Sequence, residues 1–176
     1  EMPQAKGAHD FVGVNYYTRD YVKFNLGKAN FAENYYRKDA ERSYTGFLAN
    51  EPEGFRKSIQ WAGQFGLPIY ITENGWEDPT DDGRRLYLLD HLLAMWQEVN
   101  NNAQVKGYYH WSLVDNFEWE RGWSQRFGLW GLDPATQQRI RRKSVDLYSE
   151  ICHTNSISSE AVEKWAPELY ERIFPG

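Results

Sequence analysis

One short segment constrains the fold of this chain more than any other: the apolar run LPIYI at 67–71, followed at once by the polar residues TENG at 72–75. β-Branched and aromatic residues without polar alternation predict a strand that is buried on both faces. Such strands occur in parallel sheets covered by helices, and these sheets carry their chemistry at the carboxyl ends of the strands. Glu73 lies at such an end and is a candidate functional residue, although a glutamate that leaves a strand can also simply face water.

Two other segments have the same character. Residues 11–16 (FVGVNY) and 105–111 (VKGYYHW) are short, rich in strand-forming residues and followed by polar or aromatic side chains. Helical periodicity over 53–65 and 84–100 separates the three predicted strands. Strands that alternate with helices predict a parallel sheet of βαβ units, and hence the α/β class.

Each predicted helix has one apolar face, which is expected to pack on the sheet. The residues of these faces are Phe55, Ile59, Ala62 and Phe65 in the first helix, and Leu86, Leu89, Leu92 or Leu93, and Trp96 in the second. His91 is expected on the surface of the second helix, or with its hydrogen bonds satisfied.

The remaining segments are less regular. Residues 20–50 show no sustained periodicity and predict a long loop above the sheet. Residues 131–136 predict a turn between two short extended pieces, and residues 143–152 predict a helix that includes the single cysteine, Cys152, as a buried and inert residue. Residues 158–174 predict a further helix, with Ser158 or the next serine as its cap.

Length and charge exclude several classes of protein. The 176 residues fall short of the roughly 250 of a typical (β/α)8 barrel, and the chain begins with Glu1, so we expect it to open within a domain. A net charge of −5 with dispersed basic residues argues against nucleic acid or an anionic membrane as partner. No apolar run approaches the roughly 20 residues that cross a bilayer, and the lack of a visible anchor favours a cytoplasmic location.

Other features of the composition concern ligands. One cysteine excludes an internal disulfide framework, and the four histidines lack metal-ligand spacing, so no metal is expected. Aromatic residues make up 16% of the chain and include eight tryptophans. Sugars present flat C–H faces to aromatic rings and hydroxyls to carboxylates and amides, so this composition suits a carbohydrate site.

Three motifs together resemble the retaining β-glycosidases of glycoside hydrolase family 1. They are FVGVNYYT at 11–18, ITENG at 71–75, and WSLVDNFEW at 111–119 with RGWSQRFGL at 121–129. They occur in the family's order, and the resemblance covers nearly all of residues 7–155. It implies the C-terminal part, about strands six to eight, of a (β/α)8 barrel over 1–155, followed by a C-terminal helical extension over 156–176.

The resemblance also implies roles for particular residues. In that family the glutamate of the TENG motif is the catalytic nucleophile, which corresponds to Glu73, and a tyrosine corresponding to Tyr17 orients it by a hydrogen bond. The implied sugar-binding residues are Asn15, Trp111, Glu118, Trp119 and Phe127. Because a carboxylate accepts hydrogen bonds from hydroxyls and repels phosphate, Glu118 favours unphosphorylated β-glycosides. No cofactor is implied.

The tripeptide Asn50-Glu51-Pro52 spells the word that carries the acid/base glutamate in that family. In the family the word ends a buried strand, after threonine and an apolar residue and far upstream of the nucleophile. Here it precedes a predicted helix, so Glu51 is interpreted as a charge that the helix dipole stabilises. The acid/base is expected in an N-terminal barrel portion that this chain lacks, and the chain alone is expected to be inactive.

Two other functions fit the same residues. A non-catalytic carbohydrate-binding protein could retain the barrel without its second carboxylate, although such a protein has no chemical need for Glu73. A glycosyl-transferring enzyme could use the same site with a sugar in place of water as acceptor. The resemblance favours hydrolysis of a terminal β-D-glycosyl unit. Glucose is the expected sugar, and galactose and fucose stay open as alternatives.

Overall fold

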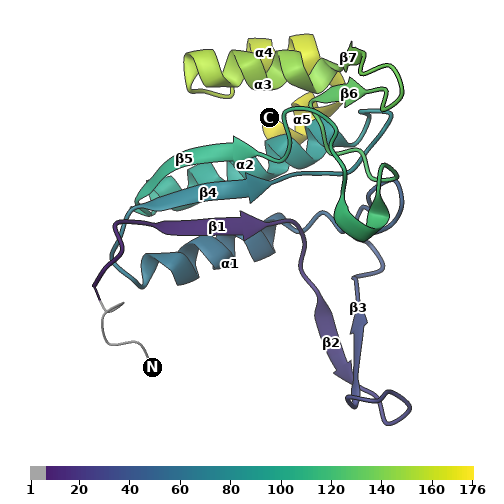
Figure 1. Cartoon of the computed structure of the whole chain (residues 1–176). Coiled ribbons are helices and arrows are strands. Elements are labelled where there is room, and N and C mark those ends of the chain that lie inside the picture. Colours follow the sequence, from purple (N-terminus) through teal and green to yellow (C-terminus); the bar gives the residue numbers. More distant parts are fainter. Residues whose placement is uncertain (1–6) are drawn as a thin grey trace.

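The computed structural model describes residues 7–176, and its centre is a three-stranded parallel sheet (Figure 1). The strands are β1 (Val12–Tyr16), β4 (Ile69–Asn74) and β5 (Val105–His110), in the order β1-β4-β5. The three predicted strands are confirmed, and their arrowheads in Figure 1 point to the same side of the molecule. The carboxyl ends of the strands therefore meet at one edge of the sheet.

The register brings the polar ends of the strands together. Asn15 on β1 lies opposite Glu73 on β4, after an irregularity between Val14 and Asn15. Asn74 lies opposite His110 on β5. The candidate residues of the TENG motif are thus flanked on both sides by the ends of neighbouring strands.

Helices α1 (Pro52–Gly63) and α2 (Arg84–Asn100) connect these strands, as predicted. The buried residues of α1 pack on β1 and β4 in one hydrophobic cluster, which contains Val14, Tyr16, Phe55, Ile59, Ala62, Ile69, Ile71 and Ala94. Because one helix lies in each connection between neighbouring parallel strands, α1 and α2 pack on the sheet as in βαβ units.

Two of the expected core contacts are wrong. Phe65 is 52% exposed because α1 ends before it, and it packs edge-on against Trp61, which is itself exposed. Trp96 is 59% exposed, whereas Leu89 and Leu92 of the same helix are buried. Periodicity identified the buried stripe of α2, but its last large residue lies at the margin of that stripe.

The region 20–50 is more ordered than predicted. It contains an antiparallel hairpin of β2 (Tyr21–Phe24) and β3 (Ala32–Tyr35), which projects away from the sheet (Figure 1). Aromatic rings pair across its strands and near its tip, at centroid distances of 5.7 Å for Tyr21 with Tyr35 and 6.4 Å for Phe24 with Phe31. Since the hairpin is exposed on both faces, it lacks the alternation by which a half-buried strand is predicted.

The chain after β5 forms short elements and then helices. A 3₁₀ turn η2 (Trp119–Arg121) precedes the hairpin of β6 (Trp130–Leu132) and β7 (Arg139–Arg141), which confirms the predicted extended pieces and their turn. Helix α3 (Lys143–Thr154) follows, and Cys152 on it is exposed, not buried as expected. Within residues 7–176, no helix has the length and apolar character needed to span a membrane.

The predicted helix over 158–174 is divided into α4 (Ser159–Trp165), η3 (Pro167–Leu169) and α5 (Tyr170–Ile173). Ser158 caps α4 by accepting a hydrogen bond from the Ala161 N–H at 3.1 Å. The break falls at Pro167, which cannot donate the backbone hydrogen bond that would continue the helix. One hydrophobic cluster joins this segment to α2 and α3; its buried members are Leu88, Leu89, Leu92, Leu147, Ile151, Val162, Ala166, Leu169 and Ile173.

His91 lies in the core and not on the helix surface. It is fully buried, with its ring 3.8 Å from that of Tyr87 and 5.3 Å from that of Phe55. Its Nδ1 donates to the Tyr87 carbonyl at 2.9 Å, and no described residue bonds its Nε2. Burial lowers the pKa of His91 to about 3, because an imidazolium would lose its hydration there.

This burial predicts a pH dependence of stability. Below pH 6.5 the unfolded chain protonates this histidine, whereas the folded chain does not until about pH 3, so protonation favours unfolding over this range. Between pH 6.5 and 4, the free energy of unfolding should fall less steeply in the His91→Gln variant than in the parent. The two slopes should differ by up to about 1.4 kcal/mol per pH unit. Urea denaturation at several pH values measures the slope, with the exposed His153→Gln as control. Equal slopes in the parent and in His91→Gln would contradict the prediction.

Candidate active site

A cavity of about 500 Å³ lies at the carboxyl ends of the strands. Six of the seven predicted site residues line it: Tyr17, Glu73, Trp111, Glu118, Trp119 and Phe127. They come from the ends of β1, β4 and β5 and from the loop that follows β5. Parallel pairing thus brings together residues that are up to 110 positions apart, from Tyr17 to Phe127.

Glu73 and Tyr17 are in direct contact. The Tyr17 hydroxyl donates a hydrogen bond of 2.6 Å to Glu73 Oε2. Burial and this hydrogen bond raise the pKa of Tyr17, so the phenol keeps its proton and acts as a donor. This short bond from a phenol fixes the orientation of the Glu73 side chain.

A buried polar network holds the backbone behind this contact. Asn74 is fully buried; its Nδ2 donates to the Tyr16 carbonyl at 2.7 Å and to the Tyr87 hydroxyl at 2.9 Å. The Tyr108 hydroxyl donates to Asn74 Oδ1 at 2.7 Å, and the Tyr87 hydroxyl donates to the Tyr17 carbonyl at 2.7 Å. The network joins all three strands to α2 and so fixes the position of Tyr17 relative to Glu73.

Asn15 is the one predicted site residue that does not line the cavity. It is exposed and accepts a hydrogen bond of 2.6 Å from the Thr72 hydroxyl. Because it lies opposite Glu73 in the sheet register, it is a neighbour of the cavity and not part of its wall.

The motif after β5 supplies the aromatic side of the cavity. Trp111 Nε1 donates to Glu118 Oε1 at 3.1 Å, and Asn116 Nδ2 donates to the same oxygen at 2.8 Å. Within residues 7–176 no donor bonds Glu118 Oε2, which leaves this oxygen as an acceptor for a ligand. Phe127 is buried with its ring edge-on to Tyr17, whereas Trp119 is 82% exposed.

The close approach of β4 and β5 requires a glycine at position 75, directly after β4. A Cβ at Gly75 would lie 1.9 Å from the Trp111 carbonyl oxygen, so only glycine lets the ends of β4 and β5 approach this closely. The Trp111 N–H also donates to the Asn74 carbonyl at 2.9 Å. The glycine of the TENG motif therefore positions Trp111 beside Glu73.

The sequence did not identify several other residues of the cavity. These are Thr18, Phe47, Leu48, Glu120, Arg121 and Gln125. Phe47 lies in a region without periodicity, and the Arg121 guanidinium stacks on its ring at 4.3 Å. The available signals were the position of Thr18 at the end of the motif at 11–18, and that of Glu120, Arg121 and Gln125 within the tryptophan-rich segment 111–129.

Glu51 lies elsewhere. It precedes α1, is buried, and accepts a hydrogen bond of 2.9 Å from Arg37 Nε. It does not line the cavity that contains Glu73. Among residues 7–176, no group of three or more histidine, cysteine, aspartate or glutamate side chains is arranged to hold a metal ion.

The family profile described as glycosyl hydrolase family 1 matches residues 1–157. The chain belongs to glycosyl hydrolase family 1. It is 35% identical to a β-galactosidase of Pyrococcus woesei, over 93% of this chain and 35% of that protein. It is also 35% identical to β-glucosidase A of Thermotoga maritima, over 89% of this chain and 37% of that protein.

Solved structures agree with the family assignment. A β-glycosidase from Pyrococcus horikoshii superposes with a TM-score of 0.80 at 34% identity, over 89% of this chain and 37% of that one. A family 1 β-glucosidase from Thermotoga maritima gives 0.78 at 33% identity, over 85% and 36%. The chain thus spans roughly a third of these family 1 proteins, and its sheet is the predicted C-terminal part of their (β/α)8 barrel.

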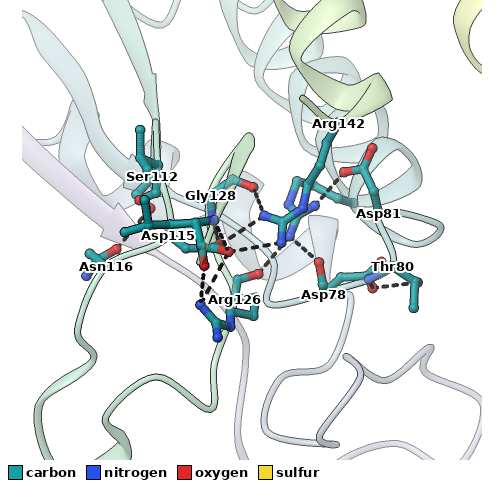
Figure 2. Close-up of polar contacts among 12 residues, drawn as sticks. Asp78, Thr80, Asp81, Ser112, Asp115, Asn116, Arg126, Gly128 and Arg142 are labelled. Carbon is teal, nitrogen blue, oxygen red and sulfur yellow. Dashed lines mark hydrogen bonds and ion pairs between the residues drawn. The ribbon is translucent and has the colours of Figure 1, made fainter. Parts of the chain in front are cut away.

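Buried ion pairs hold the tryptophan-rich loop that follows β5 (Figure 2). The carboxylate of Asp115 is almost fully buried and accepts from the backbone N–H of Gly128 at 2.8 Å and of Leu132 at 3.2 Å. Arg142 Nη1 and Nη2 donate to its two oxygens at 2.9 and 3.0 Å. Asp115 therefore ties the start of the loop to its end and to the residue before α3.

A second buried pair extends this scaffold to the loop after β4. The Arg84 guanidinium is fully buried, pairs with Asp81 and donates to the Arg126 carbonyl at 2.7 Å. Asp81 in turn accepts from the Ser144 N–H at 2.9 Å. Arg126 connects the two pairs, since its carbonyl accepts from Arg84 and its Nη1 lies 3.7 Å from Asp115 Oδ2 (Figure 2).

Asp115→Asn should destabilise the fold strongly. The variant leaves the Arg142 charge buried without its partner, and breaking a buried pair in this way costs about 3–5 kcal/mol. The matched control is Asp146→Asn, whose partner Arg141 is more than half exposed, and this change should cost less than about 1 kcal/mol. Urea denaturation measures both, and comparable losses in the two variants would contradict the prediction.

Proposed function

We propose that this chain supplies the nucleophile side of the active site of a retaining β-glycosidase. The observation that carries the proposal is the Tyr17–Glu73 hydrogen bond of 2.6 Å, inside a cavity that Trp111 and Glu118 also line. An ionised carboxylate held in one orientation beside an aromatic surface and a free acceptor oxygen suits attack on a bound sugar.

The reaction proceeds in two steps. Glu73 attacks the anomeric carbon as the glycosidic bond breaks, and a second, protonated carboxylate about 5 Å away gives its proton to the leaving oxygen. That carboxylate then takes a proton from water, which attacks the glycosyl-enzyme ester and releases the sugar with retained configuration, regenerating ionised Glu73. We assign the second carboxylate to the remainder of the barrel, because Glu51 does not line the cavity, Glu118 is assigned to the sugar hydroxyls and the Glu120 side chain is 82% exposed.

The other residues act on the bound sugar. Trp111 provides the flat surface for its C–H face, and Glu118 Oε2 accepts hydrogen bonds from its hydroxyls. Trp119 and Phe127 complete the wall of the binding site, and Asn15 borders it at the end of β1, where it can reach a sugar that extends past the wall. Since Glu118 would repel a phosphate, the substrate class is unphosphorylated β-glycosides.

The named activities of relatives bear on the sugar. Relatives of 35% identity include both a β-galactosidase and a β-glucosidase. The Thermotoga maritima β-glucosidase has been solved in complex with deoxynojirimycin and with a galacto-hydroximolactam. These names support a terminal β-D-glycosyl unit as substrate, and we propose glucose as the preferred sugar.

The test is Glu73→Gln in the complete barrel protein that contains this chain. The amide has the size of the carboxylate but is not a nucleophile, so turnover of an aryl β-glucoside should fall below about a hundredth of the parent while the fold is kept. The control is Glu53→Gln, an exposed glutamate at the start of α1. Retained turnover in Glu73→Gln would remove Glu73 from this role. A complete parent that binds glucosides without turning them over would favour the carbohydrate-binding alternative.

A further inference from the structure

The segment after residue 157 lies beyond the part that the family profile matches, and its Arg172 contacts Glu41, at the base of the segment that forms one wall of the cavity. Phe47 and Leu48 belong to this wall and lie within the segment 41–50. Backbone hydrogen bonds close the segment at its base, from the Asn50 N–H to the Glu41 carbonyl at 2.9 Å and from the Ser43 N–H to the Leu48 carbonyl at 3.0 Å. The segment is therefore a closed turn whose ends fix where Phe47 and Leu48 lie.

Arg172 on α5 binds one end of this turn directly, at Glu41, and reaches the other end, Asn50, through Asp90 of α2. Its Nη1 donates to Glu41 Oε1 at 3.2 Å, and its Nε and Nη2 donate to the two oxygens of Asp90 at 3.1 and 2.7 Å. Asp90 Oδ2 also accepts from Asn50 Nδ2 at 2.7 Å, and the same amide donates to Glu41 Oε2 at 3.0 Å. The four side chains form a closed ring, in which Arg172 is the only positive charge.

The Asp90 and Asn50 half of this ring is buried, whereas the Arg172 and Glu41 side chains are 47% and 46% exposed. Asp90 and Asn50 are 7% and 6% exposed, and the Asp90 carboxylate has Arg172 as its one cationic partner among the described residues. A buried carboxylate that loses its partner must gain water or a proton, and either change disturbs the hydrogen bond to Asn50. Arg172 itself is held in place because α5 packs through Ile173 into the core shared with α2 and α3.

We propose that Arg172 is a positioning residue that holds the segment 41–50, and with it the Phe47 and Leu48 wall, so that the C-terminal segment helps to set the affinity for glycosides. This inference rests on the proposed function for its effect on substrate, but the contact between Arg172 and the segment 41–50 can be tested without turnover. Glu77 limits the effect, because its Oε1 also holds the turn through Ser43 at 2.7 Å and the Thr45 N–H at 2.9 Å.

The first test measures hydrogen–deuterium exchange of the backbone amides in the complete barrel protein. Arg172→Gln should increase exchange over residues 41–50, and Arg172→Lys should increase it less, since lysine keeps the charge but not the two parallel hydrogen bonds. Glu168→Gln is the matched control, because it breaks the Arg85 ion pair of the same C-terminal segment without contacting the turn. Equal exchange over 41–50 in Arg172→Gln and Glu168→Gln would overturn the proposal.

The second test measures kcat and KM for an aryl β-glucoside. Arg172→Gln should raise KM about three- to tenfold with little change in kcat, because it alters a binding wall and leaves Glu73 in place. In a Phe47→Ala background the same substitution should raise KM much less, since two changes that act through one contact are not additive. Fully additive increases, or a fall in kcat alone, would overturn the proposal. A complete parent without turnover would instead contradict the proposed function, and the exchange measurement would still decide the role of Arg172.

Discussion

The buried amide of Asn74 is the interaction on which the rest of the site depends. It bonds the backbone of β1, the Tyr108 side chain of β5 and the Tyr87 side chain of α2, so it joins the three strands whose ends reach the cavity to α2. A buried amide with all its partners in place is stable only in one arrangement, because each lost hydrogen bond would leave a polar group unsatisfied. Glu73, the preceding residue, is thereby held beside Tyr17 with little freedom to move.

Around this centre the loops are held by charges that lie below the surface. Asp115 with Arg142 fixes the tryptophan-rich loop, and Arg84 with Asp81 fixes the loop after β4. Such pairs add little net stability compared with apolar packing, but they tolerate few alternative geometries. These two buried pairs therefore hold the long loops of the cavity in one conformation. A sugar site needs this arrangement, because recognition of hydroxyls depends on fixed donors and acceptors.

The sequence predicted the parts of the fold that depend on local pattern. The three strands and the limits of α2 follow from runs and repeats of apolar residues, and the motifs around Glu73 and Trp111 identified the family. The contact between Tyr17 and Glu73 followed from the family resemblance, but contacts between distant residues outside the motifs were not predictable. Nothing in the local sequence of Tyr87 indicates that its hydroxyl bonds the Tyr17 carbonyl, and Arg172 lies 131 positions from Glu41. The prediction of burial also failed where a residue lies past the end of its helix, as for Phe65.

The central claim is that Glu73 forms a covalent bond to the sugar. The most direct measurement is to incubate the complete barrel protein with 2-deoxy-2-fluoro-β-D-glucosyl fluoride, whose fluorine slows hydrolysis of the glycosyl-enzyme more than its formation, and to map the modified peptide by mass spectrometry. The account predicts one 2-fluoroglucosyl group per molecule, on Glu73. A label on Glu51 or Glu118, or a protein that binds the reagent without any covalent modification, would contradict it.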